Sequence, residues 1–320
     1  MRVTRGIPAA AASPVALTIG NFDGVHLGHQ AMLAELMRAA GRLGLPACVL
    51  TFEPHPREFF APDKAPVRLT ALREKLEWLA RCGVDRVHIC RFNYGFAQIA
   101  AEDFIDEVVA RGLGARWVLV GDDFRFGARR AGDFVMLKQQ APRLRFEVTA
   151  LPSVALGGER VSSTAVREAL AGGDLDRAGR LLGRAYSING RVMRGDGLGR
   201  KLGFPTANVQ MKHNRPPLNG IFAVRLHGAG REPLPGVASL GVRPTVKQGG
   251  APVLEVHVLD FSGDLYRCHV RVEFLHKFRD EEKYADLATL TKQISLDVEN
   301  AKDFFSRQAA RAPRNASTKF

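Results

Sequence analysis

The chain has 320 residues and a formal net charge of +13, and 46% of its residues are hydrophobic. This length and composition are typical of a globular protein with two domains. No apolar run approaches the roughly 18 residues of a membrane helix, and the first residues lack the apolar core of a signal peptide. We therefore expect no membrane partner.

The positive charge by itself would fit a protein that binds nucleic acid. However, the lysines and arginines are spread along the chain, and no zinc-finger, RNA-recognition or basic-helix signature is present. Substrates with several phosphates would be attracted by the same charge. The four cysteines form no Cys-x-x-Cys pair, which favours a reducing, cytoplasmic setting.

The first motif in the chain is TIGNFDGVHLGHQ at residues 18–30. It lies between a predicted strand at 14–19 and a predicted helix that ends near Gly44, with apolar residues at helical spacing. A tight turn between a strand and a helix aims backbone N–H groups and the helix dipole at an anion. Gly24 and Gly28 leave room for a ligand to approach the backbone.

Two histidines, His26 and His29, lie three residues apart at the start of this helix and therefore share one face. Two imidazoles and a row of backbone donors suit a phosphate. A metal-binding pair is the alternative, but no third ligand stands at a recognisable spacing and no cysteine is near.

The rest of the first half alternates strands with helices, which predicts a parallel sheet with helices on both faces. The strands are expected at 47–52, 87–92, 116–121 and 145–150, and the helices at 70–80, capped by Thr70, and at 102–111.

Two loops follow the ends of predicted strands, at the edge where open parallel sheets bind ligands. One is FEPHPREFF, in which Pro54 and Pro56 forbid a continuing strand or helix and so predict a stiff loop. The other is GDDFRFGARRAGD, which begins at Gly121. Further on, a hydroxyl cluster, Ser162 to Thr164, begins a helix and is either a simple helix cap or a phosphate contact.

From Tyr186 onward, alternating apolar and polar residues replace helical spacing. This pattern predicts five or six short strands in a small antiparallel barrel, with a final helix over 287–307. We expect the domains to span 1–183 and 184–320.

The main motif of the second half is GDGLGRKLGFPTAN at residues 195–208. It is no Walker loop, because Arg200 and Leu202 replace the required glycine and hydroxyl residue. From the glycines alone it could be a plain hairpin loop. Thr206 and Asn208, two apart in an extended segment, point the same way and suggest a magnesium–phosphate site.

Taken together, TIGNFDGVHLGH, FEPHPREF, VGDDFRFG and VSSTAVR resemble the N-terminal domain of bacterial bifunctional riboflavin kinase/FAD synthetases. GDGLGRKLGFPTAN resembles their riboflavin kinase domain. The resemblance implies an α/β fold with a Rossmann-like HxGH nucleotidylyltransferase domain, followed by an antiparallel β-barrel kinase domain with a terminal helix. It also implies two reactions that consume MgATP: phosphorylation of riboflavin to FMN, then adenylylation of FMN to FAD with release of pyrophosphate.

The same resemblance implies roles for individual residues. The catalytic residues would be His26, His29, Arg167 and, as general base of the kinase, Glu255. ATP would contact Gly20, Asn21, Phe22, Asp23, Gly24, Ser163 and Thr164 in the first domain, and Gly195, Gly197, Gly199, Lys201 and Gly203 in the second. Flavin would contact Phe52, Arg57, Asp123, Phe124, Phe126 and Arg279, and Mg²⁺ would bind Thr206 and Asn208. Asn219, Gly220, Phe222, Arg243 and Pro244 would shape the nucleotide and flavin pockets.

Two alternatives stay open at this point. One is a nucleotidylyltransferase of other specificity, such as pantetheine or cytidylyl chemistry, against which the Phe-rich loops and the kinase-like second half argue. The other is a basic nucleic-acid-binding protein that keeps a nucleotide fold. The sequence carries no signal for an oligomeric state.

Overall fold

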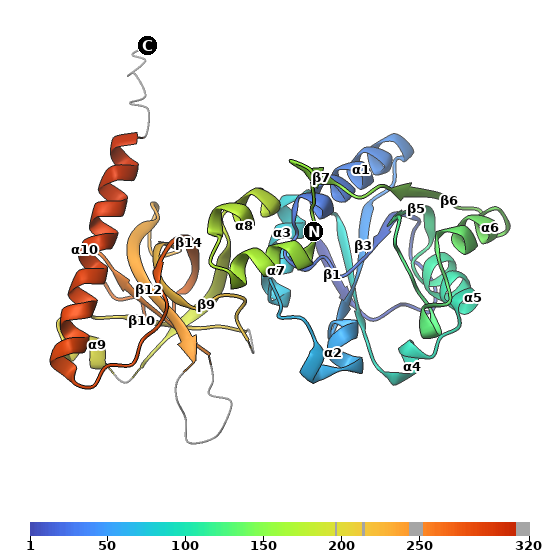
Figure 1. Cartoon of the computed structure of the whole chain (residues 1–320). Helices are drawn as coiled ribbons and strands as arrows, with labels where there is room; N and C mark the ends of the chain where they lie inside the picture. Colours follow the sequence, from blue (N-terminus) through green and yellow to red (C-terminus); the bar gives the residue numbers. More distant parts are fainter. Residues whose placement is uncertain (196, 213–214, 243–251, 312–320) are drawn as a thin grey trace, which may run out of the picture. The chain divides into compact units, whose positions relative to one another are not determined.

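The computed structural model describes residues 1–195, 197–212, 215–242 and 252–311. The chain forms two compact units. The first contains Met1–Val166 and Leu181–Gly183, and the second contains Arg167–Arg180 and Arg184–Phe320. Each unit carries a sheet of its own (Figure 1).

The first unit is built on a six-stranded sheet with the order β1-β4-β3-β2-β5-β6, in which every neighbouring pair is parallel. The strands are β1 (Arg2–Arg5), β2 (Val15–Ile19), β3 (Ala47–Glu53), β4 (Arg86–Arg91), β5 (Ala115–Gly121) and β6 (Glu147–Leu151). Central strands of such a sheet are buried on both faces, and β2 is buried along its whole length.

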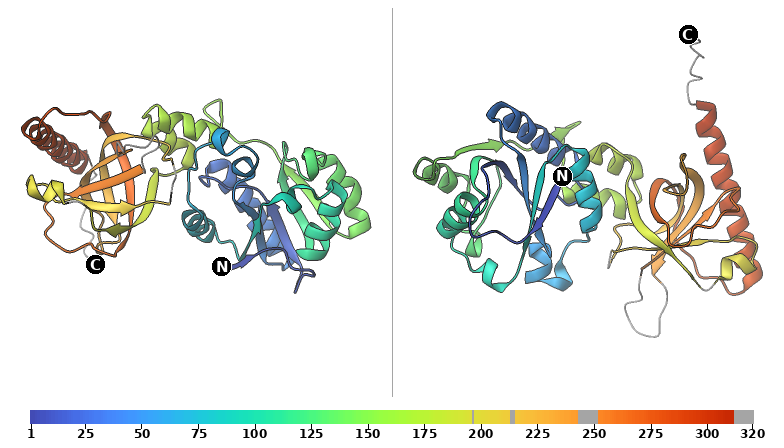
Figure 2. Two further views of the ribbon diagram at one scale, coloured as in Figure 1. Left: turned by 90° about the horizontal axis from the view of Figure 1, so that it is seen from below. Right: turned by 180° about the vertical axis from the view of Figure 1, so that it is seen from behind.

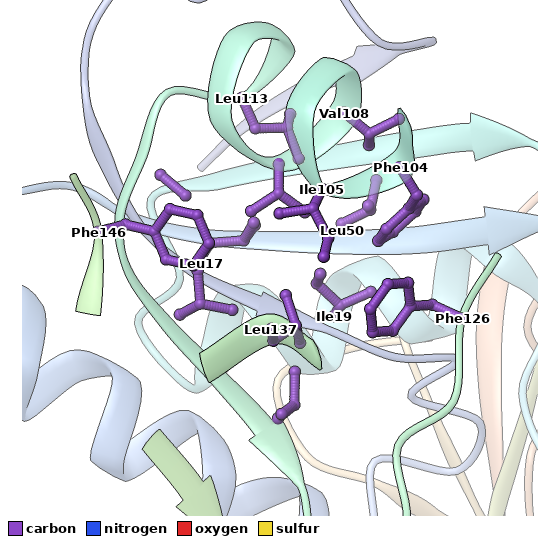
Figure 3. Close-up of a cluster of buried hydrophobic side chains, with 14 of the residues drawn as sticks. Leu17, Ile19, Leu50, Phe104, Ile105, Val108, Leu113, Phe126, Leu137 and Phe146 are labelled. Carbon is purple, nitrogen blue, oxygen red and sulfur yellow. The ribbon is translucent and has the colours of Figure 1, made fainter. Parts of the chain in front are cut away.

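Helices cover both faces of this sheet, and the side chains of β2 alternate between them. Leu17 and Ile19 pack against one group of helices, which includes the π-helical segment η2 (Phe104–Gly112) and α6 (Phe134–Leu144) (Figure 3). Ala16 packs against the other group, which includes α1 (Leu27–Leu43) and α3 (Leu72–Arg81). The shorter elements are α2 (Pro56–Phe60), η1 (Pro62–Lys64), α4 (Tyr94–Ala97), α5 (Ala101–Asp103), η3 (Ala128–Arg130), β7 (Ala155–Leu156) and β8 (Glu159–Arg160).

The structure corrects two local expectations and adds one strand that was not predicted. The stiff loop after β3 contains the helix α2, because Pro56 occupies its first turn, where the missing N–H costs nothing. The N-cap of α3 is Ala71 rather than Thr70, and the backbone N–H of Ala71 donates to Glu74. The first residues of the chain, where no element is predicted, form the edge strand β1.

The second unit contains a closed antiparallel barrel with the order β10-β13-β12-β11-β14-β9. Its strands are β9 (Ser187–Met193), β10 (Ala207–Gln210), β11 (Gly220–His227), β12 (Leu234–Val242), β13 (Pro252–Val258) and β14 (His269–Arg279). The helices of this part of the chain are α7 (Ser163–Ala171), which begins in the first unit, α8 (Leu175–Leu182), α9 (Leu198–Lys201) and α10 (Leu287–Arg311).

The long helix α10 runs along the outside of the barrel (Figure 2). Ala301, Val298 and Phe305 on α10 pack against Ile221 and Val237 of the barrel. The predicted fold class, a parallel α/β domain followed by an antiparallel barrel with a terminal helix, is confirmed.

Candidate active sites

The first candidate site lies where the strand order of the parallel sheet reverses. The chain runs from β2 to β3 and β4 on one side and then returns to β5 on the other side of β2. Ligands of open α/β sheets bind at the carboxyl ends of the strands at such a switch point. A cavity of about 210 Å³ is found there. Its lining includes His26, Gly28, His29, Asp122, Asp123, Ser162 and Ser163.

The turn between β2 and α1 owes its shape to residues with positive φ. Gly24 has φ 81° and Phe22 has φ 49°, a conformation that is uncommon for a bulky residue. The Phe22 ring is fully buried in the core and tilts against the His29 ring at 5.1 Å. Phe22 therefore shapes the predicted nucleotide turn through its backbone, while its side chain belongs to the core.

Asp23 anchors this turn to the segment before α3. Its buried carboxylate accepts hydrogen bonds from the backbone N–H groups of Leu69 (3.1 Å) and Thr70 (3.0 Å) and from the Thr70 hydroxyl (3.2 Å). The Thr70 hydroxyl in turn accepts a bond from the backbone N–H of Gly24 at 3.1 Å. Thr70 thus fixes the turn instead of capping a helix. The Asp23 carboxylate stabilises the shape of the turn through these hydrogen bonds.

The two histidines are held as a stacked pair. Their ring centroids lie 3.7 Å apart with an interplanar angle of 18°. His26 is the N-cap of α1, and its Nδ1 accepts a bond from the backbone N–H of His29 at 3.3 Å. Because Nδ1 of His26 acts as an acceptor, the neutral ring carries its proton on Nε2 and can donate it to a ligand.

The hydroxyl cluster divides its tasks at the start of α7. Ser162 Oγ accepts a bond from the backbone N–H of Ala165 and so caps the helix. Ser163 Oγ donates to the Asp23 carbonyl oxygen at 3.0 Å and lines the cavity. Thr164 is exposed, and Arg167 lies one turn later on α7, where it is assigned to the second unit.

Asn21 and the glycines of the turn complete the predicted ATP contacts. The side-chain oxygen of Asn21 is buried and has no hydrogen-bond partner among the described residues, as expected for a group that awaits a ligand. A Cβ at Gly20 would lie 3.2 Å from the Phe22 ring, and one at Gly24 would lie 2.7 Å from Leu69. A side chain at Gly20 would therefore press on the Phe22 ring, and one at Gly24 would in addition be strained by the positive φ.

The residues predicted to face flavin do not share one environment in the structure. Phe52, at the end of β3, makes aromatic contacts with Phe92 at 6.0 Å and Phe96 at 5.8 Å. Arg57 is exposed on α2. Asp123 lines the histidine cavity and forms an ion pair with Arg160.

Two further predicted flavin residues of this unit, Phe124 and Phe126, lie toward the core. The Phe126 ring is 6% exposed and packs 5.2 Å from Phe104 among the core side chains (Figure 3). Phe124 stacks on Phe126 at 5.5 Å and is partly buried. The Phe126 ring thus supports the loop from the core side, and its flavin contact stays a prediction.

An aromatic cluster at the ends of β3 and β4 was only partly anticipated. Phe92 contacts the rings of Phe52, Phe59, Phe60 and Phe96 at centroid distances of 5.6 to 6.0 Å. The Phe60 ring is 65% exposed. Phe92 and Phe96 were not predicted as site residues, because Phe92 was taken as the last residue of the predicted strand at 87–92; an aromatic residue at the end of a predicted strand was a usable signal.

A charged cluster adjoins α2. Arg68 forms ion pairs with both Glu53 and Glu58. Burial tends to raise the pKa of the Glu58 carboxyl, but the hydrogen bond and charge of Arg68 prevail, so that this pKa is lowered. The cluster therefore joins the end of β3, the helix α2 and the segment that leads to Thr70.

The second candidate site lies on the barrel, where three predicted residues are brought together. Asn208 on β10 is directly opposite Glu255 on β13. The Thr206 hydroxyl donates to Glu255 Oε2 at 3.4 Å. As predicted, Leu254, Val256 and Val258 are buried while Glu255 faces the other way and is partly exposed. Thr206 also lines a cavity of about 450 Å³ together with Arg200 and Tyr266.

The glycine-rich segment next to this site contains one short helix, α9, instead of an open loop. A Cβ at Gly195 would lie 2.3 Å from the Asn208 amide, so any other residue there would displace this predicted magnesium ligand. Gly199 packs in the same way, with its Cβ position 2.4 Å from the Phe204 carbonyl oxygen. The other residues predicted in this segment are Gly197 (φ 70°), Gly203 (φ 89°) and Lys201, which is exposed.

The side-chain oxygens of Thr206 and Asn208 suit a magnesium ion, a hard cation that takes oxygen ligands and is usually bound together with substrate phosphates. The described residues contain no group of three or more histidine, cysteine or acidic side chains that could hold a metal ion by themselves. A metal at this site would therefore depend on the nucleotide for further ligands.

Arg279 has a different environment from the one expected. Its guanidinium binds Asp297 on α10 through Nε (3.0 Å) and Nη2 (2.6 Å), and Nη1 donates to the Asp280 carbonyl oxygen. Its predicted flavin contact would require these bonds to open. Phe222 is buried inside the barrel, Gly220 begins β11 with φ 125° and Asn219 is exposed. Arg243 and Pro244 lie outside the described residues.

Two parts of the chain match known protein families, and together these matches define the class of protein. Residues 9–165 match the family described as FAD synthetase, and residues 182–305 match the family described as riboflavin kinase. The two matches coincide with the unit that carries the histidine turn and with the barrel that carries the GFPTAN segment. They define a two-domain enzyme that joins a FAD synthetase domain to a riboflavin kinase domain.

Individual relatives narrow this class to one family. The chain is 48% identical over 308 residues to the bifunctional riboflavin kinase/FMN adenylyltransferase of Escherichia coli (strain K12), a match that covers 95% of this chain and 98% of the relative. The corresponding enzyme of Pseudomonas fluorescens is 49% identical over 294 residues, which cover 92% of this chain and 94% of the relative. The chain belongs to the family of bifunctional riboflavin kinase/FMN adenylyltransferases, as the motifs predicted.

A solved structure agrees with the fold over nearly the whole chain. A crystal structure described as a macrolide-efflux protein from Streptococcus pneumoniae has a TM-score of 0.80 and 27% identity, and the match covers 94% of this chain and 99% of that one. In the present structure, none of the helices formed by the described residues is long and apolar enough to span a membrane.

Proposed function

We propose that this chain makes FAD from riboflavin in two ATP-dependent steps, each at a site of its own. The barrel phosphorylates riboflavin to FMN, and the parallel α/β unit adenylylates FMN to FAD and releases pyrophosphate. The observation that carries this proposal is that each unit has its own cavity, lined by residues of its own motif. The family of the chain supports both activities.

The adenylyl transfer needs no covalent intermediate with the protein. The phosphate of FMN is already a nucleophile, so the barrier comes from charge repulsion and from alignment with the α-phosphorus of ATP. His26 Nε2–H, His29 and the start of α7 would hold the ATP phosphates. Arg167 would place its positive charge near the negative charge that develops on the pyrophosphate as it leaves.

The flavin ring would be bound by the aromatic cluster around Phe92, at the edge of the same sheet. This cluster offers ring faces and edges from two strand ends, and Phe60 opens to solvent. Phe52 and Arg57 keep their predicted place on the flavin side. Asp123 is better placed on the nucleotide side, because it lines the histidine cavity.

In the kinase step, Glu255 would act as the general base. Its carboxylate would accept the proton of the ribityl 5′-hydroxyl as that oxygen attacks the γ-phosphorus of ATP. Thr206 and Asn208 would bind Mg²⁺, whose charge offsets that of the ATP phosphates. The glycine-rich segment from Gly195 to Gly203, with Lys201, would cover the nucleotide.

The free cysteines support a proposal for the cellular location of the enzyme. We place the enzyme in the cytoplasm, where thiols stay reduced, and the four cysteines are all free. Its partners would be riboflavin, FMN and ATP, with no part for nucleic acid.

The proposal is tested by incubating purified protein with riboflavin, ATP and MgCl₂ and separating the flavins by chromatography over time. FMN should rise first and then pass to FAD. Glu255→Gln should abolish FMN formation and leave the conversion of added FMN to FAD unchanged. Glu299→Gln, on an exposed position of α10, is the matched control and should preserve both steps. If Glu255→Gln still makes FMN, Glu255 is not the base.

A further inference from the structure

A buried lysine that no motif predicted lies next to the nucleotide turn of the first unit. Lys75, on α3, is 5% exposed. Its Nζ donates to the Thr51 hydroxyl at 3.5 Å, and this hydroxyl donates to the Asn21 carbonyl oxygen at 3.3 Å. A chain of two hydrogen bonds therefore leads from Lys75 to the turn that carries the predicted phosphate contacts.

The charges that face Lys75 are already engaged elsewhere. Asp23 from the turn, Glu53 from β3, Glu58 from α2 and Arg68 from the segment before α3 all act on it through space. Arg68 holds the two glutamates in ion pairs, and Asp23 binds residues 69 and 70. In the part of the chain that the structure describes, no carboxylate forms an ion pair with Lys75.

A lysine in such a place is costly if it serves packing alone. Burial disfavours an ammonium group, and this is why the pKa of Lys75 is lowered, although Asp23 and Glu53 oppose the effect. An apolar side chain of the same length would fill the space without that cost. The position of Lys75 therefore points to a task in the site.

Asn21 is the residue of the turn that this chain of hydrogen bonds reaches. The backbone of Asn21 is fixed by Thr51, while the buried oxygen of its side chain has no partner among the described residues. The Thr51 hydroxyl links this backbone carbonyl to the Lys75 ammonium group.

We propose that Lys75 is a positioning residue of the adenylyltransferase: through Thr51 it orients Asn21 toward the substrate phosphates and adds positive charge behind them. This inference rests on the proposed function of the first unit. It names no contact between Lys75 and substrate, because the lysine is buried behind the turn.

The test uses the full chain and four variants: Lys75→Met, Lys75→Arg, Thr51→Val and Arg73→Met. Arg73 lies on the exposed face of the same helix and pairs only with Glu77 among the described residues, so its variant is the matched control. The measurements are kcat and KM for FMN conversion to FAD between pH 6 and 10. Tryptophan fluorescence follows unfolding of the first unit, because both tryptophans of the chain, Trp78 and Trp117, lie there.

Lys75→Met should lower kcat by about 100-fold, the scale of a misplaced reacting group, without lowering the melting temperature. Lys75→Arg should keep more activity than Lys75→Met and move the alkaline limb of the pH profile to higher pH, because a guanidinium keeps its proton. Thr51→Val should lower kcat in the same direction with the fold intact, and it serves if Lys75→Met does not fold. Arg73→Met should match the unmodified chain.

The inference is overturned if Lys75→Met folds and stays within about twofold of the unmodified chain, or if kcat falls only together with the melting temperature in both Lys75→Met and Thr51→Val. An alkaline limb that is identical in Lys75→Arg and the unmodified chain would also overturn it. These outcomes are distinct from a failure of the proposed function, in which the unmodified chain itself would convert no FMN to FAD.

Discussion

The ion pair between Arg279 and Asp297 fastens α10 to the barrel, and its removal gives a quantitative test. The side chains of Arg279 and Asp297 are 20% and 5% exposed. Two hydrogen bonds join them, and Gln293 donates a further bond to Asp297 at 3.1 Å. Asp297→Ala would leave a largely buried guanidinium without its counter-charge.

Breaking a buried pair in this way costs about 3–5 kcal/mol. Because Arg279 keeps some contact with water, we expect the lower end, about 3 kcal/mol, which corresponds to a fall of roughly 10 °C in the melting temperature of the barrel. Calorimetry of the full chain measures this change. Arg279→Met and the double variant complete a double-mutant cycle, in which we expect a coupling energy of about 2–3 kcal/mol.

Two results would refute this reasoning. One is a cost below about 0.5 kcal/mol for Asp297→Ala, the range of ordinary surface substitutions. The other is additivity of the two single changes, which would mean that the pair does not act as a unit. Activity gives a separate answer about flavin: if Arg279 only anchors α10, Arg279→Met leaves the KM for riboflavin unchanged at a temperature where the barrel is folded.

Three further predictions concern the first unit. Thr18→Val removes a fully buried hydroxyl that donates to a carbonyl oxygen of β5, and it should lower the free energy of unfolding by about 1 kcal/mol in urea titrations, whereas no change would contradict this bond. Because the pKa of Glu58 is lowered in the folded state, its carboxylate stabilises the fold above its ordinary pKa of 4.5, and this stabilisation is lost as the pH falls through the lower folded pKa. Glu58→Gln should therefore lose less stability in acid than the unmodified chain. An equal loss in both proteins would mean that the pair with Arg68 contributes nothing. Burial raises the pKa of both Cys48 and Cys90 to about 12, so a thiol reagent at pH 8 should modify at most two of the four cysteines before denaturant is added, and rapid reaction of all four would be the contrary result.

The local geometry of both candidate sites could be predicted because most of their residues stand in short contiguous segments. The turn with His26 and His29 lies between one strand and one helix, so local spacing was sufficient to place both rings on one face. Thr206, Asn208 and Glu255 follow the two-residue period of strands, and the structure pairs Asn208 with Glu255 as neighbours. Periodicity also predicted the parallel sheet, the barrel and the final helix.

Only the tertiary structure decided what the side chains between these motifs do. Thr70 had the pattern of a helix cap, but its partner, Asp23, lies 47 residues earlier in the chain. Phe126 followed a strand end like the other aromatic residues, yet its ring packs into the core. Lys75 resembled any charged residue of an amphipathic helix, and nothing in the sequence around Arg279 indicated its bond to Asp297. A pattern along the chain records neighbours in sequence, whereas burial, hydrogen bonding and ion pairing depend on residues that meet only when the chain is folded.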